Sequence, residues 1–237
     1  MRKNFTLFPP FSQAGLLEYS LQLSLIILSI LIATGVDRCN QRRNDHQKVH
    51  AYLQAILQDL ENDQESNELN LVDGENDIVS LERALSLVQY PHDDSLTLFV
   101  DQFFTVFLKG VFRTFPPTTF DLMRSSGDLA LLKDLDLRND LAVYFAFRDN
   151  IVRSDLQQYD QYIFKTVEGI GQYFDLACLN ARDQPLACLT DRDGLLNHPR
   201  NELVLLLRQA NLRVFHLQIA VQNGEKMLAR LKVALQH

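Results

Sequence analysis

The feature that most constrains this sequence is an uncharged apolar run near its N-terminus. No charged residue occurs in segment 19–36, and its centre, Leu25–Ala33, consists mainly of leucine and isoleucine. A helix rising about 1.5 Å per residue would make this run about 27 Å long, close to the hydrocarbon core of about 30 Å. We therefore predict a membrane-spanning helix over 16–36, with Tyr19 near one interface and a short tail over 1–15.

Two other interpretations of this run remain. A cleaved signal peptide would start with Arg2 and Lys3, but a leader of about 35 residues exceeds the usual length of about 15–30. A buried core helix is the third interpretation, although no other segment is apolar all round over such a length. The positive charges near the run are Arg2 and Lys3 on its N-terminal side, and Arg38, Arg42, Arg43 and Lys48 on its C-terminal side. This count slightly favours a cytoplasmic C-terminal part, but large domains translocate largely regardless of charge, so the side stays open.

Small residues recur at helical spacing within the predicted span. Ser20 and Ser24 are four residues apart, and so are Ser29 and Ala33. Small residues at this spacing let two membrane helices approach closely. The alternative is that each serine hydroxyl bonds to a carbonyl of its own helix.

The segment 37–90 keeps a helical pattern beyond the predicted span. Apolar residues recur at steps of three and four from Val49 to Leu60, as they do in coiled coils. There is no proline or glycine between Val36 and Asp73, so we predict one continuous stalk helix. The polar run 61–70 interrupts the apolar stripe and indicates either a solvated stretch of helix or a break.

The remaining segment, 91–237, is predicted to be an antiparallel helical bundle, which makes the whole chain all-α. Proline and glycine are scarce, at 7 and 9 residues, which disfavours a turn-rich β fold. Thr118 with Asp121 has the spacing of a helix start, and Gly127 that of a stop. The predicted elements are a turn at 90–94, helices over 96–115, 135–176 and 203–235, and a long loop over 180–198 that has room for one helical turn.

Composition and motifs exclude several kinds of activity. The net charge of −7 and the pI near 5.3 argue against nucleic-acid binding, which needs clustered positive charge. His46 and His50 share a helix face but lack the glutamate of a zinc protease and a third ligand. Asp191–Gly194 resembles the start of a calcium loop but lacks its later ligands. We predict no catalytic, cofactor-binding or metal-binding residue.

Cys178 and Cys188 both occur in an Ala-Cys-Leu sequence and flank a turn-rich stretch. A chain reversal there would bring them together, so they are a candidate disulfide in an oxidising compartment; in the cytosol they would be buried thiols. Cys39, next to the predicted span, is a candidate for lipid attachment or an intermolecular bridge, or is an inert helix residue.

Three stretches follow one another in a recognisable order: the end of the apolar run, Ile30–Asp37, then Thr119–Leu129 with its Ser-Ser-Gly stretch, and then Leu132-Lys133 with Leu137–Leu141. This order resembles a family of uncharacterised bacterial single-pass membrane proteins. Gln22 and Cys39 stand where members often have glutamate and tryptophan. The resemblance implies a bacterial inner-membrane location and a helical domain, and it brings no known activity, cofactor or site residue.

Two functions follow from these patterns. The first is a non-enzymatic, membrane-anchored scaffold or protein-interaction module in the bacterial envelope, which contacts the lipid bilayer and either a second copy or an unknown protein. The second is a membrane-tethered sensor whose helical domain binds a small ligand. A sensor needs a pocket in the bundle, for which the candidate lining residues are Phe103, Phe107, Tyr144 and Tyr162.

Overall fold

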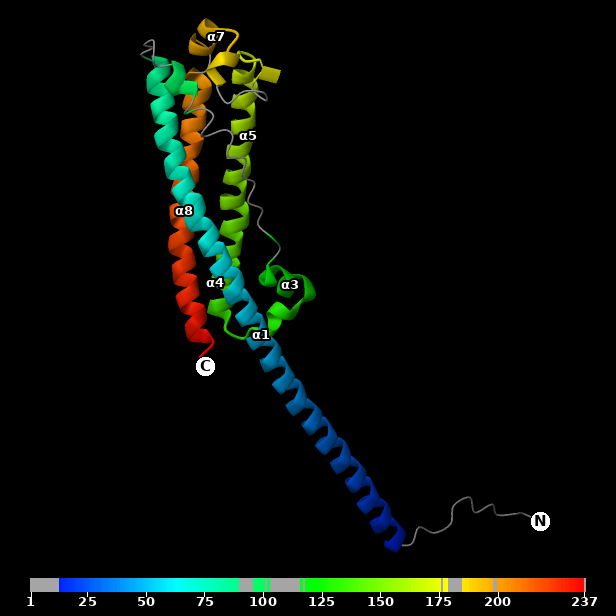
Figure 1. Ribbon diagram of the computed structural model, residues 1–237. Helices are drawn as coiled ribbons and strands as arrows, with labels where there is room; N and C mark the ends of the chain where they lie inside the picture. The colour runs from blue at the N-terminus through cyan, green and yellow to red at the C-terminus, as the bar shows by residue number, and fades with distance from the viewer. Residues whose placement is uncertain are drawn as a thin grey trace, which may run out of the picture. The chain divides into compact units, whose positions relative to one another are not determined.

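The protein is all-α, as predicted, in the residues that the computed structural model describes (Figure 1). Among these residues the only β-type pairing is one isolated bridge between Phe174 and Leu189. Most of the predicted helix 96–115, the predicted turn at 90–94 and the start of the last helix at Pro199 lie outside the described residues. The described ranges are 13–89, 96–100, 102, 116, 118–175, 177–178, 185–197 and 200–236, with backbone only for 13–20 and 185.

The longest element is α1, Gln13–Gln89, a single helix of 77 residues. The chain divides into two compact units, Met1–Ala51 and Tyr52–His237. In the first unit the described apolar side chains from Leu21 to Val36 are more than half exposed or close to it. By length and composition, α1 is apolar enough near the N-terminus to cross a membrane, a property that signal sequences share.

The second unit contains all other described helices. These are α3 (Thr119–Ser126), α4 (Leu135–Phe147), a π-helical turn (Arg148–Val152), α5 (Arg153–Gly171), α7 (Arg192–Asn197) and α8 (Arg200–Ala234), with short 3-10 turns at Asp128–Leu131 and Pro185–Cys188. The predicted helix 135–176 is therefore helical to residue 171, with the π turn inside it. The predicted boundary at residue 90 differs from the division at residue 52, because the second half of α1 packs into the domain core.

In the second unit the C-terminal half of α1 runs side by side with α5 and α8 (Figure 1). Arg148 pairs with Asp63, and Tyr159 further along α5 bonds to Asp77 further along α1, so these two helices run parallel. In α8 the order is reversed, since Lys232 pairs with Glu61 and Arg213 with Asp77. In these pairings α8 runs antiparallel to α1, whereas α1 and α4–α5 point the same way.

The core side of α1 and α8 follows a heptad pattern. Buried positions alternate at steps of three and four along both helices, which is the spacing that keeps one seam facing a partner helix. They are 53, 56, 60, 63, 67, 70, 74, 77, 81, 84 and 88 in α1, and 203, 206, 210, 213, 217, 220, 224, 227 and 231 in α8. The largest apolar cluster joins Leu81, Phe99, Tyr159 and Leu206 with their neighbours at one end of the unit.

The short helix α3 begins and ends as the sequence predicts. Thr118 and Asp121 form a capping box, and Gly127 ends the helix at a φ of 80°, which favours glycine. Two hydrogen bonds hold this region to α1: Thr119 N donates to Asp59 Oδ2 at 2.7 Å, and Tyr52 Oη donates to Asp128 Oδ2 at 2.7 Å.

Candidate functional site

The most unusual part of the second unit is a polar stretch in the core of α1. Asp63, Asn67, Asn70, Gly74 and Asp77 occupy successive heptad positions, all are buried, and apolar positions flank them on both sides. The polar run 61–70 is therefore not a break: it is helical throughout, with one side exposed at 61, 62, 65, 68 and 69 and the other side buried at 63, 64, 67 and 70. Two of its side chains pair with residues of other helices, Asp63 with Arg148 and Glu61 with Lys232 of α8.

The first polar layer consists of Asp63 and Arg148. The distance from Arg148 Nε to Asp63 Oδ2 is 2.8 Å, and both side chains are less than a tenth exposed. Arg148 Nη2 also donates to the carbonyl oxygen of Pro116 at 3.0 Å. Arg148 is the first residue of the π turn, a local distortion that often occurs where a helix must place a particular side chain.

The second polar layer consists of Asp77, Tyr159 and Arg213, two heptads further along α1. Tyr159 Oη donates to Asp77 Oδ2 at 3.1 Å, and Arg213 Nη1 lies 3.5 Å from the same oxygen. The Arg213 guanidinium also covers the Tyr159 ring at 4.7 Å from its centroid, in cation–π contact. The two layers thus repeat one arrangement, an aspartate on α1 facing an arginine from a neighbouring helix.

Burial controls the electrostatics of both layers. It raises the pKa of Asp63 from 3.8 to about 6, and the nearby Arg148 guanidinium offsets only part of this rise. Asp59 and Asp149 raise the same pKa further by charge repulsion. Burial also raises the pKa of the Tyr144 and Tyr159 hydroxyls, with smaller contributions from Asp63 and Asp77. Both hydroxyls therefore stay protonated well above neutral pH.

Between the layers, several buried polar atoms have no hydrogen-bond partner among the described residues. They are Gln64 Oε1, Asn67 Oδ1, Asn70 Nδ2 and Tyr144 Oη. The helices also approach closely here at two glycines. A Cβ at Gly74 would lie 2.8 Å from Val214 Cγ2, and one at Gly224 would overlap Gln64 Oε1. Side chains of the facing helices thus fill the space beside both glycines.

The chemistry of the layers is that of helix recognition. A buried ion pair contributes little net stability, because desolvation offsets the attraction, but a misplaced partner leaves a buried charge and is costly. Polar groups at heptad core positions therefore specify which residues face each other. Within the described residues, no group of three or more histidine, cysteine or acidic side chains is placed to hold a metal ion.

The histidines of the described chain do not converge. His46 and His50 are exposed on α1 in the first unit. His216 on α8 pairs through Nδ1 with Asp155 Oδ2 on α5, and its ring meets Phe147 edge to face. His92 lies outside the described residues.

The segment that resembles the start of a calcium loop caps a short helix. Asp191 Oδ1 accepts a hydrogen bond from Gly194 N at 2.9 Å at the start of α7.

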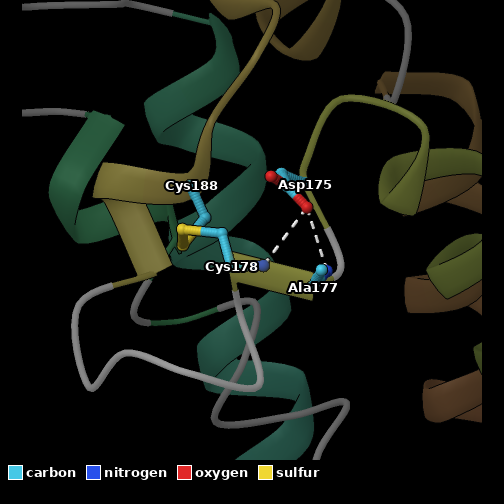
Figure 2. The surroundings of a disulfide bond; sticks show 4 residues. All are labelled: Asp175, Ala177, Cys178 and Cys188. Carbon is cyan, nitrogen blue, oxygen red and sulfur yellow. Dashed lines mark hydrogen bonds between the residues drawn. A yellow bond between two sulfur atoms is a disulfide. The ribbon is translucent and has the colours of Figure 1, made fainter.

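Cys178 and Cys188 form a disulfide, with their Cα atoms 5.4 Å apart (Figure 2). Asp175 stabilises the chain reversal before it, since its Oδ1 accepts hydrogen bonds from Ala177 N at 2.9 Å and Cys178 N at 3.2 Å. On the other side, Asp175 N donates to the Cys188 carbonyl at 2.8 Å. Cys39 is an exposed free thiol in the first unit.

At two positions of the predicted span, the serine hydroxyl bonds to a carbonyl of its own helix. Ser24 Oγ donates to the Leu21 carbonyl at 3.0 Å, and Ser29 Oγ donates to the Leu25 carbonyl at 2.8 Å. Ala33 is exposed, and the side chain of Ser20 lies outside the described residues. A role of this face in helix association stays a prediction.

The aromatic pocket predicted for a sensor is not assembled from the residues that the structure describes. Phe103 and Phe107 lie outside them, Tyr162 packs against the large apolar cluster, and Tyr144 lines a surface groove between α4 and α8. Sequence reasoning missed the two polar layers, although positions 63, 67, 70, 74 and 77 continue the spacing of the apolar stripe.

Comparison with known proteins finds no matching family model, no similar curated protein and no similar solved structure. The resemblance to bacterial single-pass membrane proteins therefore stays a prediction from the sequence.

Proposed function

We propose that this chain is a single-pass membrane protein of the bacterial envelope whose helical domain acts as a non-enzymatic scaffold or protein-interaction module. The observation that carries the proposal is the continuity of α1 over Gln13–Gln89. One helix includes both the candidate membrane span and the heptad core positions of the domain. A domain tethered in this way, with no glycine- or proline-rich linker, is suited to holding a partner at the membrane surface.

The disulfide supports a location for the domain outside the cytoplasm. Disulfides persist in oxidising compartments such as the periplasm and are reduced in the cytosol. The count of lysine and arginine around the span favours the opposite orientation, but charge has little influence on the translocation of large domains. We therefore propose that the domain lies on the outer side of the inner membrane.

Crosslinking next to the candidate span tests this function. Cys39 is exposed and is the one free cysteine in the sequence beside the disulfide pair, so a benzophenone maleimide can be attached to it in native membranes. The same label is placed one residue at a time around the helix in a Cys39→Ser chain carrying Asn40→Cys, Gln41→Cys or Arg42→Cys. These four positions cover one helical turn.

The proposal predicts that irradiation gives an adduct, to a second copy or to another protein, whose yield depends on the labelled position. A specific interface occupies one face of the helix, so at least one of the four labels should react several-fold more than the label on the opposite side. Adducts of equal yield at all four positions, or a monomer alone at every position, would contradict a protein-interaction role for this helix.

The sensor alternative is favoured by one observation. Tyr144 lines a surface groove, while its hydroxyl is buried near Gln64 of α1, because both Tyr144 Oη and Gln64 Oε1 lie within 3.8 Å of the Cβ that a side chain at Gly224 would carry. A ligand in the groove would thus contact a residue that borders the helix carrying the candidate span.

A further inference from the structure

The surface groove between α4 and α8 has a volume of about 360 Å³. Its lining residues on α4 are Asp140, Val143, Tyr144 and Phe147, which are spaced i, i+3, i+4 and i+7 and so form one stripe along the helix. The stripe is about 10 Å long at about 1.5 Å per residue. Volumes of about 300–1,000 Å³ are typical of small-molecule sites, and this groove is at the lower end.

The facing stripe on α8 has the same spacing. It consists of Asn223, Lys226, Met227 and Arg230, and it runs in the opposite direction because α8 is antiparallel to α4. Tyr144 and Met227 are buried and form the floor, whereas Val143 is 70% exposed and forms an apolar wall. The groove therefore offers an apolar surface, open to solvent, on which the apolar part of a small ligand can lie.

Charge at the groove is unevenly distributed. Arg230 pairs with Asp140 at one end, so these two charges compensate each other. Lys226 is exposed at mid-groove and has no acidic partner among the described residues. One uncompensated ammonium group thus lies beside an apolar floor, in a protein whose net charge is −7.

We propose that the α4–α8 groove binds a small amphipathic monoanion, namely a carboxylate on an apolar body about 10 Å long. The apolar body lies on Val143, Tyr144 and Met227, and the carboxylate pairs with Lys226. Burying the body removes apolar surface from water, and the ion pair selects an anion over a neutral molecule of the same shape. This site goes beyond the scaffold function and does not depend on it.

Equilibrium dialysis of the full chain in lipid nanodiscs tests the proposal. The probe is 2-naphthoate, the neutral control ligand is 2-naphthamide, and empty nanodiscs of the same lipid give the blank. We expect saturable binding of one 2-naphthoate per chain with a dissociation constant on the order of 0.1–1 mM, the range that its size allows. 2-Naphthamide should bind at least about fivefold more weakly, although it partitions into lipid more readily than the anion.

Variants distinguish the groove from the rest of the surface. Lys226→Met should weaken 2-naphthoate binding by about fivefold, the upper range for an exposed ion pair, and leave 2-naphthamide unchanged. Lys165→Met removes an exposed lysine on α5 and is the matched control that should change neither. Val143→Trp adds bulk at an exposed position, so it should leave folding intact, as judged by circular dichroism, and abolish binding of both ligands.

Three results would overturn the proposal: no saturable binding above the empty-nanodisc blank, equal affinity for the acid and the amide, or equal loss of binding in Lys226→Met and Lys165→Met. None of them bears on the crosslinking result, because the labels at 39–42 lie in the other compact unit. Failure of the ligand site and failure of the scaffold function are thus distinguishable.

Discussion

At the scale of single residues, Asp63 shows the balance between loss of hydration and charge attraction in the core of the helical domain. Its carboxylate is paired with Arg148, and yet its pKa rises to about 6, because the loss of hydration outweighs the attraction of the guanidinium. A pair with this balance does not stabilise the fold strongly. It penalises arrangements in which Asp63 or Arg148 is buried without the other.

The raised pKa of Asp63 predicts how stability depends on pH. Its value is 3.8 in the unfolded chain and about 6 in the fold, so the folded state binds a proton more tightly. The contribution of Asp63 to the free energy of unfolding is therefore fully present below the unfolded pKa and is lost as pH rises through the folded pKa. Asp63 should add about 1 kcal/mol to the free energy of unfolding when pH falls from about 7 to about 5.

Urea unfolding of the full chain in detergent micelles measures this effect when wild type is compared with Asp63→Asn. Asp121, with a lowered pKa, and Asp160, with a raised pKa, are present in both proteins, so the difference in pH slope isolates Asp63. The free energy of unfolding of Asp63→Asn should not rise by this amount when the pH falls from about 7 to about 5. Identical slopes for the two proteins would show that Asp63 is not buried against Arg148 as described.

The two buried tyrosines give a second test at the residue scale. Tyr159 donates a hydrogen bond to Asp77, so Tyr159→Phe should lower the free energy of unfolding by about 1–2 kcal/mol. Tyr144 Oη has no partner among the described residues, so Tyr144→Phe should be neutral within about 0.5 kcal/mol or stabilising. Chemical denaturation of both variants checks this order, and a larger loss for Tyr144→Phe would contradict the arrangement.

At the scale of the elements, α1 and α8 depend on glycine for their close approach. A methyl group at Gly74 would lie 2.8 Å from Val214 Cγ2, and the β-branched valine cannot rotate away cheaply. Gly74→Ala should therefore destabilise by about 1–2 kcal/mol in spite of the better helix propensity of alanine. Gly169→Ala on α5 is the control, because its methyl group would find only the Glu202 carboxylate at 3.7 Å, and it should stabilise slightly.

The double variant Gly74→Ala with Val214→Ala decides the cause, measured by the same denaturation. If the clash is responsible, adding Gly74→Ala to a Val214→Ala background should cost nothing or should stabilise. An unchanged penalty in that background would place the origin elsewhere than in the contact between α1 and α8.

The helices themselves could be predicted from the sequence to a large extent. The spacing of Leu137, Leu141 and Tyr144 gives the start of α4, and Thr118 and Gly127 give both ends of α3, because these signals are local. The burial of Asp63 and Asn67 could not be predicted in the same way. Arg148, the partner of Asp63, is far away in the sequence, and a search for apolar residues passes over polar core positions.

The disulfide could be proposed from the sequence, whereas the groove could not. Cys178 and Cys188 were candidates on spacing alone, and the chain reversal at Asp175 brings them together. The groove exists only because α4 and α8 are rotated so that their two stripes face each other. The sequence of the α4 stripe, which contains Val143, does not determine that rotation. Faces of single helices are thus predictable, whereas a site shared by two helices needs their packing.

At the scale of the whole molecule, one chain carries a candidate membrane span, a disulfide and a helical core. We propose that the helical domain is anchored by α1 and lies in an oxidising compartment. Cys178 and Cys188 are the natural reporters of this claim, because a disulfide in the domain would not persist in the cytosol.

The most direct test is membrane-impermeant maleimide labelling of intact bacterial cells that express the Cys39→Ser chain, with and without prior treatment by an impermeant phosphine reductant. The account predicts that the chain stays with the membrane after alkaline extraction and that Cys178 and Cys188 are labelled in intact cells only after reduction. Labelling that requires cell lysis but no reductant would show free thiols in the cytoplasm and would contradict it.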